Sequence, residues 1–156
     1  MTTWPDLPRD ITAVAVSAVM SRDVLVVGPQ DPVVEVWQRM QNLRASVAVV
    51  CDATRVVAVV SERTLAVWWP SGGPGEIRRR QVRDIIDSGT PTVHADTTVH
   101  QAADLMIHFQ LDGVPVVTAS GELLGLVTHT DLVRLLALGN TGLGNLDNTV
   151  RVTQRC

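Results

Sequence analysis

Two stretches of the chain, residues 47–64 (VAVVCDATRVVAVVSERT) and residues 114–131 (VPVVTASGELLGLVTHTD), follow the same pattern. Each has an apolar run, a short polar turn, a second apolar run and then polar residues that open a helix. Short runs that are apolar nearly throughout are typical of strands covered on both faces. The pattern predicts strands at Val47–Cys51 and Val56–Ser61 with a helix at Glu62–Trp69, and strands at Val114–Thr118 and Leu123–Thr128 with a helix at His129–Leu138.

The similarity extends N-terminally from both stretches. Val16–Leu65 matches Val82–Leu132 at an offset of 66 residues, which becomes 67 after one extra residue near Gln110. Each copy begins with a short strand, expected at Leu25–Val27 and at Thr92–His94, and continues with a helix. The chain is therefore an internal duplication of one small unit.

The first helix of copy one is predicted from its start and its apolar stripe. Asp31 offers an N-cap acceptor, and Pro32 suits the first helical position, where a missing N–H costs nothing. Spacing of i, i+3, i+4 and i+7 places four apolar residues on one helix face. These residues are Val33, Val36, Trp37 and Met40.

The elements predict an α/β (α+β) fold of two β-α-β-β-α repeats, packed sheet to sheet with pseudo-two-fold symmetry. Sheet-to-sheet packing is expected because so small a unit cannot bury both faces of its sheet alone. The expected organisation is an N-terminal arm at 1–14, repeat one at 15–70, a linker at 71–81, repeat two at 82–138 and a flexible tail at 139–156.

Composition excludes several classes of protein. Of the 156 residues, 46% are hydrophobic, which argues against disorder of the whole chain. The 27 Val residues favour buried strands over a helical bundle. A net charge of −3 and a pI near 5.7 do not suggest a nucleic-acid partner. All 13 basic residues are Arg, so Schiff-base and phosphate-loop lysines are excluded.

Location and metal content are also predicted from composition. No signal peptide is visible, and the apolar runs stop short of the roughly 18 residues that span a bilayer, so we expect a cytoplasmic protein with no membrane partner. Cys51 and Cys156 lack the spacing of a disulfide framework, and both are expected to be thiols. The four His residues lack metal-ligand spacing, so no metal site is expected.

Three motifs carry a resemblance to a known family. They are Val19–Val24 (VMSRDV), Asp112–Val117 (DGVPVV) and Gly125–Asp131 (GLVTHTD). With the duplicated β-α-β-β-α unit, they resemble the tandem cystathionine β-synthase (CBS) domain pair, or Bateman module, over about residues 15–138. The resemblance implies a stand-alone, non-catalytic regulatory protein with no required cofactor. Such pairs bind AMP, ADP, ATP or S-adenosylmethionine between their repeats and signal to a partner.

The resemblance also implies a binding site in repeat two. Thr128, Thr130 and Asp131 match the family's ribose- and phosphate-handling pattern, in which a carboxylate accepts hydrogen bonds from both ribose hydroxyls. The same Thr and Asp are equally the usual residues of a helix start. His129 is a further phosphate candidate. Carried over from the family, the rest of the cleft is Val24, Leu25, Ala45, Ser46 and Val47.

Repeat one departs from this pattern. Thr64 stands where the Asp is expected, and Ala58 stands where the Gly is expected, so one competent and one degenerate site are predicted. Ala45 and Ser46 replace the His or Arg that hold phosphates in many relatives, which favours AMP, adenosine or S-adenosylmethionine over ATP. Arg63 is either a substitute phosphate contact or a solvated surface arginine.

Two functions stay open at this point. The first is an adenosyl-ligand sensor that acts on an unknown regulated protein, and the second is a ligand-free interaction scaffold with decayed nucleotide sites. A homodimer is expected in either case. An enzyme is not expected, because no nucleophile–base pair or metal cluster is evident in the sequence.

Overall fold

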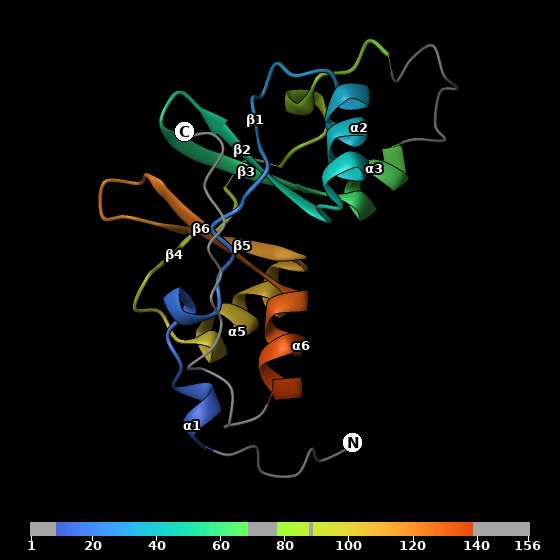
Figure 1. The fold of residues 1–156 in the computed structure, drawn as a ribbon. Helices are drawn as coiled ribbons and strands as arrows, with labels where there is room; N and C mark the ends of the chain where they lie inside the picture. Colours follow the sequence, from blue (N-terminus) through green and yellow to red (C-terminus); the bar gives the residue numbers. More distant parts are fainter. Residues whose placement is uncertain (1–8, 69–77, 88, 139–156) are drawn as a thin grey trace.

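The computed structural model describes residues 9–68, 78–87 and 89–138 (Figure 1). The start of the predicted arm, most of the predicted linker and the whole predicted tail lie outside these residues. The limits proposed for the arm, linker and tail therefore stay predictions.

Repeat one forms a three-stranded sheet with two helices. Its elements are β1 (Val26–Val27), α2 (Val33–Leu43), β2 (Val47–Asp52), β3 (Arg55–Ser61) and α3 (Glu62–Trp68). The strand order is β1-β2-β3, with β1 parallel to β2 and β2 antiparallel to β3. The predicted hairpin and both helices are confirmed.

Repeat two has the same order of elements. They are β4 (Val93–His94), α5 (Val99–Phe109), β5 (Gly113–Val117), β6 (Leu123–Thr128) and α6 (His129–Leu138), with strand order β4-β5-β6. A short helix α1 (Arg9–Thr12) lies before repeat one, and the 3-10 turns η1 (Val16–Ala18) and η2 (Val82–Asp84) precede the first strands of repeats one and two. The predicted α+β fold of two repeats is thus confirmed.

Strand β2 shows why its sequence is apolar at every position. Ala48 and Val50 pack in a core with α2 and α3, whereas Val47, Val49 and Cys51 pack in a second core that includes Leu126 of repeat two. Figure 1 shows the two sheets in the middle of the molecule and the helices outside them. Both faces of β2 are therefore buried, as the continuous apolar run predicts.

The segment that leads into the first strand of each repeat packs on the other repeat. Ile11, Val16, Val19 and Met20 belong to the core of repeat two, and the amide of Val16 donates to the carbonyl of Thr97 at 2.8 Å. Reciprocally, Val82 and Ile85 belong to the core of repeat one, and the amide of Val82 donates to the carbonyl of Asp31 at 3.0 Å. The repeats therefore exchange their entry segments.

This exchange moves the start of α2 from its predicted place. Pro32 is the N-cap residue, with an extended ψ of 132°, and not the first helical residue. It stays extended because it pairs with Gln81 of the incoming segment. The carboxylate of Asp31 caps no helix amide; it accepts the Gly28 N–H at 2.9 Å and lies 3.6 Å from Arg39. The predicted Asp31–Pro32 helix start is therefore wrong by one residue.

The expectation for Cys51 is also wrong. Its side chain is buried as predicted, at 7% exposure, but the residue is disulfide-bonded. Cys156 lies outside the described residues, so its predicted state is untested.

Candidate functional site

Asp131 lies in the first turn of α6, and Thr128 holds its side chain by hydrogen bonds. Its Oδ2 accepts the Thr128 N–H at 2.8 Å and the Thr128 hydroxyl at 2.9 Å. The Asp131 amide in turn points at Thr128 Oγ1, 3.4 Å away. This reciprocal arrangement satisfies donors that a helix start leaves unpaired. It also fixes the carboxylate in one orientation, at only 8% exposure.

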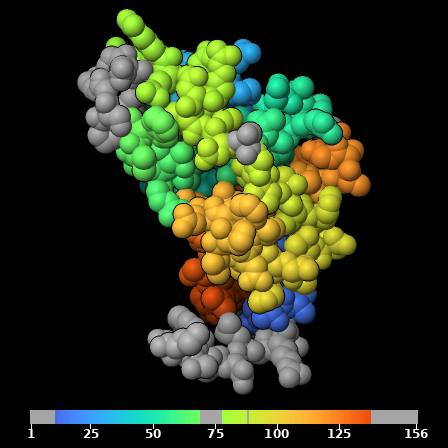
Figure 2. Space-filling model, turned by 180° about the vertical axis from the view of Figure 1, so that it is seen from behind, coloured from blue at the N-terminus to red at the C-terminus, as the bar shows by residue number. Residues whose placement is uncertain are grey.

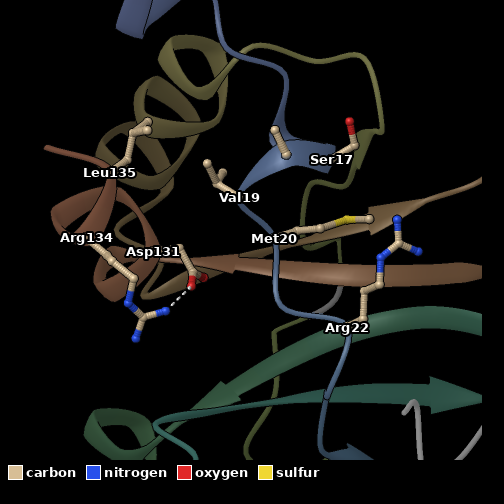
Figure 3. Close-up of a pocket in the computed structure, with 8 residues that line it drawn as sticks. Ser17, Val19, Met20, Arg22, Asp131, Arg134 and Leu135 are labelled. Carbon is tan, nitrogen blue, oxygen red and sulfur yellow. Dashed lines mark ion pairs between the residues drawn. The ribbon is translucent and has the colours of Figure 1, made fainter. Parts of the chain in front are cut away.

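A small pocket of about 130 Å³ lies beside this carboxylate. Figure 3 shows Asp131 and Arg134 of α6 facing the entry segment that carries Val19, Met20 and Arg22. The second oxygen, Oδ1, forms an ion pair with Arg134 at 3.8 Å, which is beyond hydrogen-bond distance. Asp131 therefore presents a carboxylate oxygen to this pocket, hereafter the Asp131 pocket.

Gly125 allows the entry segment to reach the Asp131 pocket. The segment crosses β6 with two hydrogen bonds of 2.9 Å, which join the backbones of Ser21 and Leu126. A Cβ atom on Gly125 would lie 2.7 Å from both Met20 Sδ and the Ser21 carbonyl oxygen. A side chain at position 125 is therefore incompatible with this close crossing.

We expect Gly125→Ala to lower the free energy of unfolding by about 1–3 kcal/mol, because Met20 and Ser21 must move away from the strand. Urea denaturation followed by circular dichroism measures the change. Gly28→Ala is the matched control: its Cβ would meet Asp31 at an ordinary 3.4 Å, and its effect should stay within about 0.5 kcal/mol. Equal stability of both variants would contradict this account of Gly125.

The equivalent place in repeat one is wider. Its pocket of about 450 Å³ includes Thr64, Ile85 and Ile86, the counterparts of Asp131, Val19 and Met20. Figure 2 shows α3 bordering the segment of residues 82–87 and the end of α5 on this face. Within the described ranges, no bridge joins Asp87 to β3 as Ser21 joins β6. We name this cavity the repeat-one pocket.

Hydroxyl groups replace the carboxylate in the repeat-one pocket. Ser61 Oγ and Thr64 Oγ1 are 3.1 Å apart, and the Thr64 amide donates to Ser61 Oγ at 3.2 Å. The local geometry of the helix start is thus kept, but position 64 carries no negative charge. One competent and one degenerate site stay a prediction, and the repeat-one pocket is larger than the Asp131 pocket.

A third pocket, of about 260 Å³, lies between the starts of α3 and α6, and we name it the inter-repeat pocket. Arg63 contributes its guanidinium, which lies 2.8 Å from the Asp112 carboxylate and 3.3 Å from the Gln110 carbonyl oxygen. His129 Nδ1 lies 3.6 Å from the same carboxylate. Asp112 thus lies close to one side chain of repeat one, Arg63, and to one side chain of repeat two, His129.

The structure divides the predicted site residues among several places. Five of them, Ser46, Arg63, Thr128, His129 and Thr130, meet in the inter-repeat pocket. Asp131 lies in its own pocket, whose lining contains none of the other predicted residues. Val47 contributes to the repeat-one pocket, Val24 and Leu25 are buried in core clusters, and Ala45 packs against the repeat-one core.

Sequence reasoning did not select Ser17, Arg22, Arg134 or Asp112 as site residues, although all four line pockets. Arg22 and Asp112 lie inside the quoted motifs, so the motifs carried a signal for both. Nothing in the sequence shows that the segment before β1 packs against α6.

Among residues 9–68, 78–87 and 89–138, no helix is long and apolar enough to cross a bilayer. No group of three or more His, Cys, Asp or Glu side chains there is placed to hold a metal ion.

The sequence matches known proteins over both repeats. The CBS domain model matches residues 16–69 and 82–138. The chain is 30% identical over 126 residues to uncharacterized protein MK0525 of Methanopyrus kandleri, which covers 79% of this chain and 63% of that protein. It is 32% identical over 111 residues to an inosine-5'-monophosphate dehydrogenase of Korarchaeum cryptofilum, covering 71% of this chain and 22% of that enzyme. The chain thus spans less than two thirds of either relative.

Solved structures share the fold. The CBS domain pair of protein MJ0100, in complex with 5'-methylthioadenosine and S-adenosyl-L-methionine, superposes with a TM-score of 0.71 at 19% identity, covering 80% of this chain and 96% of that one. CBSX2 of Arabidopsis thaliana gives a TM-score of 0.71 at 24% identity, covering 81% and 96% of the two chains. Its complex with AMP gives a TM-score of 0.66 at 23% identity, covering 79% and 96%.

Proposed function

The chain belongs to the CBS domain family, and from that premise we propose that it is a regulatory module that binds an adenosine-containing ligand and signals to a partner protein. The single observation that carries the proposal is Asp131. Its carboxylate is buried, is oriented by Thr128 and presents Oδ1 to a pocket. A ribose offers two adjacent hydroxyl donors to such an oxygen, and a hydrogen bond to a charged group contributes roughly 1.5–3 kcal/mol.

The size of the pockets indicates how the ligand lies. At about 130 Å³, the Asp131 pocket is smaller than the ~300 Å³ at which ligand sites usually begin. Residues Thr128–Thr130 precede Asp131 in the chain and line the inter-repeat pocket. We therefore place the ribose at Asp131 and the 5' substituent of the ligand toward the inter-repeat pocket.

The proposed ligands are AMP, ADP, ATP, adenosine and S-adenosylmethionine. MJ0100 and CBSX2, which share this fold, are solved with ligands of this chemical class. A ligand of this kind would regulate by favouring one arrangement of the repeats over another, with no chemical step and no required cofactor. We propose the cytoplasm as the location.

A thermal-shift panel with these ligands tests the proposal. A ligand that binds only the folded protein, at 100 times its dissociation constant, adds about 2.7 kcal/mol to stability, which raises Tm measurably. We expect Asp131→Asn to weaken the responding ligand at least about tenfold, because Asn can still cap the helix but lacks the charge. Isothermal titration calorimetry measures the affinities.

Asp96→Asn is the control for this experiment. Asp96 is exposed in the turn before α5 and lines none of the three pockets. The same loss of charge there should leave affinity unchanged. A responding ligand that binds Asp131→Asn as tightly as the parent would refute the placement of the site.

A second candidate is a ligand-free homodimeric scaffold, favoured by exposed apolar side chains on the outer helices. Ile107 is 77% exposed and Phe109 is 49% exposed on α5, while Val133 and Leu136 are 63% and 50% exposed on α6. Apolar residues of this size are typical of interfaces. We propose a homodimer through these helices under either function. A flat ligand panel, together with a dimer mass by light scattering, would favour the scaffold.

A further inference from the structure

In the inter-repeat pocket, the Asp112 carboxylate lies close to the Arg63 guanidinium and to the His129 ring. The Arg63 guanidinium donates to Asp112 Oδ1 at 2.8 Å and to the Gln110 carbonyl oxygen at 3.3 Å. The ring of His129 lies 3.6 Å from the same Oδ1. The Asp112 side chain is 23% exposed, whereas that of Arg63 is 63% exposed. Asp112 is thus the less exposed partner, and Arg63 reaches toward it from the other repeat.

A second carboxylate, that of Glu62, lines this pocket. Glu62 lies beside Arg63 on α3, and its carboxylate accepts a hydrogen bond from Gln41 at 3.0 Å. The pocket lining therefore includes two carboxylates, one permanently charged guanidinium and one imidazole. An incoming phosphate would meet a guanidinium that Asp112 already holds and would lie near both carboxylates. An uncharged or cationic group would meet neither obstacle.

We propose that Asp112 determines ligand specificity: by holding Arg63, it selects adenosine ligands whose 5' substituent is uncharged or cationic and disfavours phosphorylated ones. This inference rests on the proposed function, because it concerns the 5' end of the ligand whose ribose lies at Asp131. Arg63 held by Asp112 would not favour a phosphate in the pocket, whereas Arg63 without Asp112 would bind one.

Calorimetric titrations with adenosine and AMP test the inference. The parent protein should bind AMP no more tightly than adenosine. In Asp112→Asn, the released Arg63 should tighten AMP binding about tenfold, the low end for a hydrogen bond to a charged group, and leave adenosine binding within about twofold. The double variant Arg63→Gln/Asp112→Asn should return AMP to the affinity of the parent.

A matched control separates the ion pair from general electrostatics. Asp87 lines the repeat-one pocket with Arg63 and carries the same charge as Asp112, but it forms no ion pair with Arg63. Asp87→Asn should therefore change the AMP-to-adenosine ratio by less than about threefold. Because exposed ion pairs contribute about 0–1 kcal/mol, none of these variants should unfold the protein.

The outcomes separate this inference from the proposed function. If adenosine binds but AMP binds the parent at least about tenfold more tightly, or if Asp112→Asn leaves the ratio unchanged, the role of Asp112 is overturned while the adenosine site stands. Binding of S-adenosylmethionine alone would agree with the role of Asp112, whereas binding of a phosphorylated ligand alone would overturn it. If none of the five proposed ligands binds the parent, the proposed function fails and this inference fails with it.

Discussion

Replacing Leu126 with alanine should lower the free energy of unfolding by about 2–5 kcal/mol. Leu126 is 4% exposed and belongs to the core cluster between the two sheets. Among the described residues, it is the one buried member of that cluster that comes from repeat two. The other buried members are Val24, Val47, Val49 and Cys51 of repeat one. Truncation would leave a cavity at the point where the two repeats meet, and the rigid strands around it cannot close fully.

The measurement is equilibrium urea denaturation, with Leu43→Ala as the control. Leu43 is 65% exposed at the end of α2, outside the helices proposed for the homodimer, so the same truncation there should cost no more than about 0.5 kcal/mol. The backbone hydrogen bonds between Leu126 and Ser21 persist in an alanine variant, so the loss of unfolding free energy comes from the side chain alone. A loss below about 1 kcal/mol would show that this contact does not hold the repeats together.

Thr64→Asp should create a second ligand site in repeat one. The Thr64 amide already donates to Ser61 Oγ, as the Asp131 amide does to Thr128. A carboxylate at position 64 can therefore adopt the orientation seen at Asp131 and face the repeat-one pocket of about 450 Å³. The missing charge is worth roughly 1.5–3 kcal/mol, so affinity there should rise at least about tenfold.

Calorimetric stoichiometry measures this gain. The number of adenosine sites should increase from one to two per chain in Thr64→Asp, and it should remain one in Thr64→Asn, which has a similar shape without the charge. A folded Thr64→Asp protein with one site would contradict the view that the lost carboxylate is what disables repeat one.

The duplication and the hairpins could be predicted because strands buried on both faces are apolar at every position, which is visible in the sequence itself. Val47–Cys51 is apolar at every position, and the structure places alternate residues in two cores. The start of α2 could not be placed to the residue, because Pro32 is kept extended by Gln81, which lies far away in the sequence. Local capping rules do not include such a partner.

The candidate site was predictable on one side only. Thr128 and Asp131 are close in sequence, and their mutual hydrogen bonds follow from the helix start that the motif encodes. The opposite wall, with Met20 and Arg22, depends on a crossing of β6 that Gly125 permits. Ala58 is the counterpart of Gly125 in repeat one. The wider pocket beside it can be seen only in the folded structure.

The exchange of entry segments makes each repeat dependent on chain from the other side of the molecule. Val16 and Met20 fill the core of repeat two, and Val82 and Ile85 fill the core of repeat one. If the backbone were cleaved between Trp68 and Arg78, the core of each fragment would still contain side chains of the other fragment. We therefore expect the two halves to remain associated after such a cut, as complementing fragments, and a single repeat expressed alone to lack a complete core.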